Sequence, residues 1–265
     1  MGYKLIATDI DGTLLNSNLE ISSDTVKAIK EVQEKGILFT LATGRPIVGV
    51  KNIIDKLDIK CPVITYNGAK IVDSLTNQVL YKKELDISDA KKILELGNLY
   101  NVIICAWSND KVYVNRIEPR LERYKKISGV EPILINDYDE FSKNGITKII
   151  WYEDAKKIEK LKQLLDPNIF SNVAFATSQP YFLEFFNNEV NKGIALERIC
   201  EILNIDVKET IAFGDGLNDF PMVKAAGLGI AMENGNIETK KAAKFVTLSN
   251  DNDGIAYAIN KFILK

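Results

Sequence analysis

The chain has 265 residues, of which 46% are hydrophobic and 26% charged, as expected of a globular protein with one large domain or two modest ones. Its 34 basic and 36 acidic residues give a net charge of −2, which predicts no general attraction to nucleic acid or to an anionic membrane. Histidine is absent, so catalytic triads and metal sites that need histidine are excluded.

The sequence carries no signal for a membrane or for secretion. No apolar run approaches the ~20 residues of a membrane-spanning helix, and the first residues are a short polar lead into a strand. The cysteines, Cys61, Cys105 and Cys200, are far apart and odd in number, which favours buried free thiols in a reducing compartment. We therefore expect a cytoplasmic protein, and the sequence predicts no oligomeric state.

The first part of the chain alternates strands with helices. We expect strands over 3–9, 37–42 and 62–67, and helices over 22–35 and 46–57. The first helix has serines at its start that can cap it, and the second has a proline in its first turn. Continuous apolar strands that alternate with helices predict a parallel sheet covered on both faces.

The middle of the chain has a different, hairpin-rich pattern. We expect a hairpin turn at Thr76 and Asn77. Further on we expect two strands within 102–115, strands over 148–152 and 173–178, and helices over 88–100 and 154–165. This mixed pattern predicts a separate α+β module.

Alternation resumes in the last part. We expect helices over 191–205 and 252–264, and strands over 209–215 and 228–232. The predicted fold class is therefore α/β: a doubly wound, Rossmann-like parallel-sheet core with an inserted α+β domain. The core comprises residues 1–82 and 188–265, and the inserted domain comprises residues 83–187.

Polar residues follow three of the expected strands. Asp9 and Asp11 follow the first in DIDGT, residues 43–46 (TGRP) follow the second, and Asp215 and Asp219 follow a later one in GDGLND. Ligands bind at the carboxyl ends of parallel strands, where these side chains would meet. Several carboxylates that lie close together need a cation to balance their charge. Because all of these ligands are oxygens, we predict that the cation is Mg²⁺.

In order and spacing, DIDGT, LATGRP, the lysine of NKG and GDGLNDFPM resemble the four motifs of the haloacid dehalogenase (HAD) phosphohydrolase superfamily. Residues 177–193 and 250–256 resemble its Cof-type subfamily, which carries a large cap domain between the second and third motifs. The resemblance spans essentially the whole chain. It implies a Mg²⁺-dependent phosphatase that hydrolyses small phosphorylated metabolites, such as sugar phosphates, through an aspartyl-phosphate intermediate. Specificity would lie in the cap.

The resemblance also implies catalytic roles for three residues. Asp9 would be the nucleophile that attacks phosphorus. Asp11 would protonate the leaving oxygen and then take a proton from the attacking water. Lys192 would hold the developing negative charge.

Phosphate and metal ligands follow from the same resemblance. Thr43, the amide of Gly44 and Asn218 would bind phosphate together with Lys192. The expected Mg²⁺ ligands are Asp9, the main-chain carbonyl of Asp11, Asp215 and Asp219, with Asp219 in an outer position that orients water or Asp215.

Several alternatives stay open on the sequence alone. Lys192 could be an ordinary solvated lysine, the Thr43-Gly44 pair an ordinary turn, and Asp219 a helix cap. Arg45 could contact substrate or the cap, or form a salt bridge at a helix start. The chain could also be a phosphomutase, or a non-catalytic phosphate-binding regulatory protein. The only partner that we expect is a small phosphorylated substrate.

Overall fold

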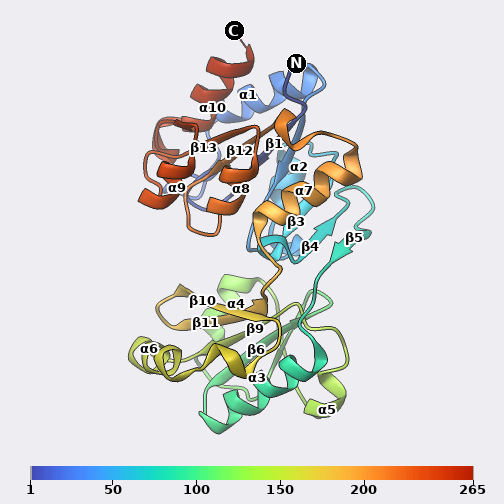
Figure 1. Cartoon of the computed structure of the whole chain (residues 1–265), viewed down its shortest axis with the longest axis vertical. Coiled ribbons are helices and arrows are strands. Elements are labelled where there is room, and N and C mark those ends of the chain that lie inside the picture. Colours follow the sequence, from blue (N-terminus) through green and yellow to red (C-terminus); the bar gives the residue numbers. More distant parts are fainter. Residues whose placement is uncertain (1, 265) are drawn as a thin grey trace. The chain divides into compact units, whose positions relative to one another are not determined.

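The computed structural model describes residues 2–264, and one part of it is built on a five-stranded parallel sheet (Figure 1). The strand order is β14-β13-β12-β1-β2. Each neighbouring pair is parallel. The strands are β1 (Leu5–Thr8), β2 (Leu38–Leu41), β12 (Thr210–Gly214), β13 (Leu228–Ala231) and β14 (Phe245–Val246).

Alternate residues of this sheet contribute to two apolar cores, one on each face. Ile6 and Phe213 belong to one core, whereas Ala7 and Ala212 belong to the other. Helices contribute to both cores: α1 (Ser23–Glu34), α2 (Lys51–Lys56) and α10 (Gly254–Ile259) to the first, and α7 (Lys192–Leu203) and α8 (Phe220–Ala225) to the second. Because successive strand residues point to opposite faces, burial of both faces explains the uninterrupted apolar runs.

The expected strand over 62–67 is shorter and leads into a turn. One parallel bridge joins Ile64 of β3 (Val63–Thr65) to Ala42, the residue that follows β2. The chain then bends through Tyr66–Gly68, where Asn67 has a φ of 55°. The Asn67 amide donates to the carbonyl of Thr43 at 2.8 Å, which fixes this turn beside the end of β2. An antiparallel hairpin follows, formed by β4 (Lys70–Val72) and β5 (Val79–Lys82).

Two expected helices are interrupted. The helix over 46–57 splits into a single turn, Ile47–Gly49, and α2, with non-helical backbone at Val50. A glycine and a β-branched residue side by side both disfavour a helix interior. The helix over 252–264 begins only at Gly254 and widens into a π-helical turn over Asn260–Leu264.

The chain divides into two compact units: Met1–Lys82 with Asn191–Lys265, and Lys83–Val190. The second unit has a six-stranded sheet in the order β10-β11-β9-β6-β7-β8, antiparallel except between β7 and β8. Its strands are β6 (Ile103–Ser108), β7 (Lys111–Val114), β8 (Pro132–Leu134), β9 (Lys148–Tyr152), β10 (Val173–Gln179) and β11 (Phe182–Asn187).

The helices of the second unit lie on both faces of its sheet. α3 (Ile87–Leu99), α5 (Tyr138–Phe141) and α6 (Ala155–Leu164) share a core with Trp151 and Leu183. On the opposite face, Tyr124 of α4 (Leu121–Ser128) contacts the ring of Phe182. The predicted fold class, a parallel-sheet α/β core with a separate α+β unit, is confirmed. β8, β11, α4 and α5 were not among the predicted elements.

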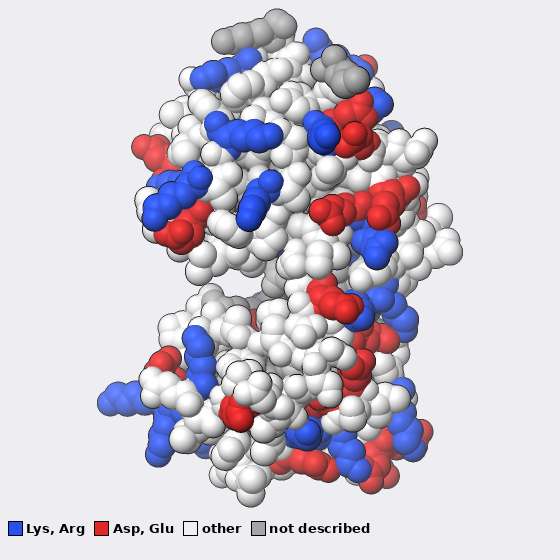
Figure 2. Space-filling view, in the orientation of Figure 1, with Lys and Arg blue, Asp and Glu red and all other residues white. Residues whose placement is uncertain are grey.

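Surface charge and cysteine burial agree with the sequence. Acidic and basic side chains both occur across the visible face of each unit (Figure 2). Within residues 2–264, no helix is both long and apolar enough to cross a membrane. All three cysteines are buried free thiols, as predicted. Burial raises the pKa of Cys61 to about 12 and that of Cys200 to about 11.

Candidate active site

The site lies where the strand order of the parallel sheet reverses. β1 pairs with β2 on one side and with β12 on the other, so later strands are added to the sheet on both sides of β1. Such a switch point leaves room for a ligand at the carboxyl ends of the strands. Asp9 follows β1 there. Its amide donates to the carbonyl of Phe213 at 3.0 Å, and only 5% of the residue is exposed.

Lys192 lies between two carboxylates. It is the first residue of α7, it is fully buried, and its Nζ lies 2.5 Å from Oδ1 of Asp9 and 2.5 Å from Oδ1 of Asp219. The preceding Asn191 caps α7 by accepting a hydrogen bond from the Ile194 amide at 2.9 Å. A buried ammonium requires such charged partners. The alternative of a solvated lysine is therefore excluded.

Asp219 organises the loop after β12. Its Oδ2 accepts hydrogen bonds from the amides of Asp215 and Gly216 at 2.9 and 2.8 Å, while its Oδ1 faces Lys192. Although it occupies the N-cap position of α8, its side chain makes no capping bond. At Gly214, a Cβ would lie 2.3 Å from the Cβ of Asp219, so this turn admits only glycine.

The turn of the first motif is packed against Asp215. The hydroxyl of Thr13 donates to Oδ1 of Asp215 at 2.7 Å. Gly12 has a φ of +86°, and a Cβ on it would lie 2.6 Å from Oδ2 of Asp215. The Asn234 side chain donates to the Gly12 carbonyl at 2.8 Å. Sequence reasoning assigned no role to Thr13 or Asn234. The only local signals were the DIDGT motif itself and the Asn234-Gly235 turn pair.

Three carboxylates converge at this point. Asp9, Asp215 and Asp219 each offer one oxygen, and these oxygens lie within 4.8 Å of one another. Burial raises the pKa of Asp9 to about 8, Lys192 acts against that increase, and Asp219 adds to it. Burial also raises the pKa of Asp215, although the hydrogen bond from Thr13 opposes the increase.

When all three carboxylates are ionised, the charges of this cluster do not balance without a further cation. Burial tends to lower the pKa of Lys192, but the Asp9 and Asp219 carboxylates more than offset this, so its pKa lies above the usual range. One ammonium then faces three carboxylates. An oxygen-lined, negatively charged site of this kind fits a hard divalent cation such as Mg²⁺.

The Asp11 side chain is not part of that cluster. It pairs with Arg45 through both carboxylate oxygens: Nε of Arg45 lies 2.9 Å from Oδ2, and Nη2 contacts Oδ1. Both side chains are partly exposed, with 53% of Asp11 and 35% of Arg45 accessible. The salt bridge of Arg45 is therefore made to the first motif.

The candidate phosphate ligands of the second and fourth motifs meet at Asn67. The buried Thr43 accepts a hydrogen bond from the Arg45 amide at 3.1 Å, and its carbonyl binds the Asn67 amide. The Asn218 side chain donates to Oδ1 of Asn67 at 3.2 Å. A Cβ at Gly44 would lie 3.1 Å from the Asn67 amide group. The turn after β3 thus joins the two motifs.

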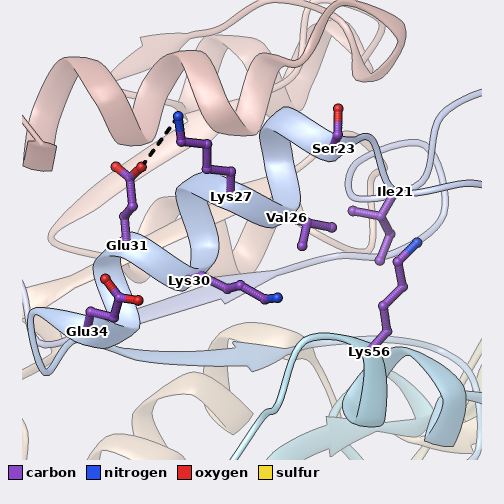
Figure 3. Close-up of a pocket in the computed structure, with 8 residues that line it drawn as sticks. All are labelled: Ile21, Ser23, Val26, Lys27, Lys30, Glu31, Glu34 and Lys56. Carbon is purple, nitrogen blue, oxygen red and sulfur yellow. Dashed lines mark ion pairs between the residues drawn. The ribbon is translucent and has the colours of Figure 1, made fainter.

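A separate hollow of about 650 Å³ lies beside α1 (Figure 3). Lysines and glutamates line most of it, and Lys27 and Glu31 pair across one turn of the helix at 4.0 Å. It shares no residue with the Asp9 site, and the carboxylate cluster that could hold a metal among the described residues lies at that site and not in this hollow. We assign it no role in the chemistry.

Comparison with known proteins identifies the family. The family described as haloacid dehalogenase-like hydrolase matches residues 6–259. A Bacillus subtilis protein named 5-amino-6-(5-phospho-D-ribitylamino)uracil phosphatase is 32% identical over 263 residues, which cover 98% of this chain and 96% of its own.

Solved structures agree with this assignment. A haloacid dehalogenase-like hydrolase from Bacteroides thetaiotaomicron has a TM-score of 0.88 and 30% identity, covering 98% of this chain and 99% of its own. A Thermotoga maritima structure also has a TM-score of 0.88, with 32% identity and coverage of 98% and 97%. The chain therefore belongs to the haloacid dehalogenase-like hydrolases, and the predicted class of enzyme, a phosphatase of this superfamily, is confirmed.

Proposed function

We propose that this protein is a Mg²⁺-dependent phosphatase that hydrolyses small phosphorylated metabolites through an aspartyl phosphate on Asp9. One observation carries the proposal: Asp9 is a buried carboxylate in contact with Lys192, within 4.8 Å of the oxygens of Asp215 and Asp219. A nucleophile needs this combination of burial, positive charge and a fixed position.

The first step transfers the phosphoryl group to the protein. A carboxylate oxygen of Asp9 attacks phosphorus and forms a P–O bond, while the bond from phosphorus to the leaving oxygen breaks. The electron pair of that bond stays on the leaving oxygen, which takes a proton from Asp11. Asp11 is then ionised, and the alcohol departs.

The second step regenerates the enzyme. A water oxygen attacks phosphorus and gives one proton to Asp11. The P–O bond between phosphorus and Asp9 breaks, and its electron pair returns to the Asp9 carboxylate. Inorganic phosphate leaves, and both aspartates are back in their starting states. Lys192, Thr43, the Gly44 amide and Asn218 are the donors that we assign to the phosphoryl oxygens.

Metal binding would involve only part of the carboxylate cluster. The carboxylates of Asp9 and Asp215 and the main-chain carbonyl of Asp11 are the ligands that we assign to Mg²⁺. Both oxygens of Asp219 already accept hydrogen bonds, so its role would be to orient Asp215. When bound, the cation would screen the repulsion between the Asp9 carboxylate and the phosphate.

Substrate selection is assigned to residues 83–190. The motif residues all belong to the other unit, and the roles proposed for them involve only groups common to every phosphate ester. The relative from Bacillus subtilis is named for a substrate with a phosphorylated ribityl chain, which supports small sugar-like phosphates as the substrate class. The net charge of −2 supports neither nucleic acid nor a membrane as a partner.

Phosphate release from p-nitrophenyl phosphate and a panel of sugar phosphates tests the proposal. We expect release that requires Mg²⁺, is lost in Asp9→Asn, and is retained in Asp24→Asn, which removes an exposed charge in the first turn of α1. Isomerisation of a sugar bisphosphate without net phosphate release would favour the phosphomutase instead. Binding without turnover would favour the regulatory protein.

A further inference from the structure

Asn234 joins segments of the first unit that lie far apart in the sequence. It belongs to the loop after β13, and its Nδ2 donates to the Gly12 carbonyl at 2.8 Å. Its Oδ1 accepts a hydrogen bond from the main-chain amide of Asn250 at 3.0 Å. A carbonyl oxygen accepts hydrogen bonds and an N–H group donates them, so these two bonds together fix which way the Asn234 amide group faces.

The same loop also contacts the segment that carries Asp215. Two residues beyond Asn234, the main-chain amide of Asn236 donates to the Asp215 carbonyl at 2.7 Å. At Gly235, a Cβ would lie 3.0 Å from the Cα and 3.0 Å from the carbonyl oxygen of Asp215, so the two main chains pack closely. The loop over 232–236 therefore binds both the turn of the first motif and the loop of the fourth.

The turn at Gly12 needs such a restraint because glycine has no side chain to limit its backbone conformations. Gly12 lies between two peptide groups that matter to the proposed metal site. The preceding group carries the Asp11 carbonyl, which we assign to Mg²⁺, and the following group leads to Thr13, whose hydroxyl binds Asp215. Asn234 holds the following group, and only the two backbone dihedral angles of Gly12 separate it from the preceding one.

We propose that Asn234 is a positioning residue for the Mg²⁺ site: it holds the turn of the first motif in the conformation in which the Asp11 carbonyl and Asp215 bind the cation together. This inference rests on the proposed phosphatase function, in which Asn234 has no assigned part. Without Asn234, metal binding would have to order the turn itself, and that cost weakens the affinity for Mg²⁺. Saturation with Mg²⁺ orders the turn again, so kcat is then restored.

Asn234→Ala tests the inference, and Asn252→Ala is its matched control. Asn252 is also exposed, and its Nδ2 donates at 2.8 Å to the hydroxyl of Ser249, a bond that does not involve the first motif. Mg²⁺ alone is titrated by calorimetry into each substrate-free protein, where misfolded molecules do not contribute to the fitted affinity. The half-saturating Mg²⁺ concentration and kcat are then measured with saturating p-nitrophenyl phosphate.

We expect Asn234→Ala to raise both the dissociation constant of Mg²⁺ and its half-saturating concentration about fivefold, the effect of losing one hydrogen bond to the main chain. Its kcat at saturating Mg²⁺ should stay within about twofold of the wild-type value. Asn252→Ala should leave the Mg²⁺ affinity and kcat unchanged. A residue that only stabilised the fold would lower the midpoint of urea unfolding without this separation of affinity from kcat.

Three results would overturn the inference and leave the phosphatase function in place. They are wild-type affinity for Mg²⁺ in Asn234→Ala, a loss of kcat in that variant without a loss of affinity, and an equal loss of affinity in Asn252→Ala. A wild-type protein that neither binds Mg²⁺ nor is activated by it would overturn the proposed function and this inference together.

Discussion

At the scale of single residues, the site is governed by a shortage of positive charge. Lys192 is the only ammonium in contact with Asp9 and Asp219 among the described residues, and Asp215 lies beside them. Burial raises the pKa of Asp9 to about 8, so a neighbouring cation would be needed to keep it ionised at neutral pH. A protonated carboxyl group would be a poor nucleophile.

We therefore expect the affinity for Mg²⁺ to depend on pH. Below pH 8 the cation must displace a proton from Asp9, so the half-saturating Mg²⁺ concentration should fall by up to about tenfold per unit as the pH rises from 6 to 8. Above that range it should level off. Titration of activity with Mg²⁺ at fixed pH values measures this, and half-saturation that does not change between pH 6 and 8 would contradict it.

The sequence predicted which residues would meet but not how their side chains are paired. The acidic residues that follow apolar strands were enough to predict that Asp9 and Asp215 lie at the same edge of the sheet. The hydrogen bond from Thr13 to Asp215 joins residues 202 positions apart, and the DIDGT motif by itself does not specify Asp215 as the partner of Thr13. The pairing of Arg45 with Asp11 depends on side-chain conformations in the same way, and sequence patterns do not specify these.

At the scale of secondary-structure elements, the strand–turn junctions matter more than the strands. The buried strands were recognisable as apolar runs, and β1, β2 and β12 all lie within their predicted ranges. The helix boundaries were predicted less well, because they depend on small local backbone preferences. The expected helix over 46–57, for example, is broken at Val50. At the turn of the first motif, Gly12 has a φ of +86° and lies so close to Asp215 that a Cβ would meet its carboxylate.

Gly12→Ala tests that junction, and Gly36→Ala is its matched control. Both glycines have positive φ, +86° and +80°, so each substitution should lower the free energy of unfolding by about 1 kcal/mol or more. A Cβ added at position 12 would meet the Asp215 carboxylate, whereas a Cβ added at position 36 would have nothing within 4 Å. We expect Gly12→Ala to lose activity and weaken Mg²⁺ binding.

Activity measured alongside urea unfolding separates the two effects. Gly36→Ala should keep its turnover despite a similar loss of stability. If both variants, or neither, lost activity at a temperature where they are folded, the contact between Gly12 and Asp215 would have no special importance for the site.

At the scale of the whole molecule, the chain is two units with separate apolar cores. The change from helix–strand alternation to hairpins predicts the insertion. It does not predict β11, whose FLEFFN run lies within the segment that resembles the Cof-type subfamily. The second unit ends at Val190, beyond that strand, whereas the sequence placed its end at 187. Nothing in the sequence indicated how much of the connection before α7 belongs to each unit.

Separate cores predict separate thermal transitions. Leu183 is fully buried in the core of the second unit, and Leu183→Ala should destabilise that unit by about 2–5 kcal/mol. In calorimetry, we expect the substitution to move the transition of the second unit to lower temperature and to leave the transition of the first unit unchanged. Adding Mg²⁺ should raise the temperature of the first unit's transition. A single transition that shifts as a whole would show that the two units unfold together.

The most direct test of the account is to look for the phosphoryl group on Asp9. Asp11→Asn should still react with p-nitrophenyl phosphate, whose leaving group needs little acid, but should lack the base for the second step. After rapid acid quenching, mass spectrometry of the peptide that contains Asp9 should show one added phosphoryl group, and Asp9→Asn should show none. Release of p-nitrophenolate with every peptide unmodified would contradict the account.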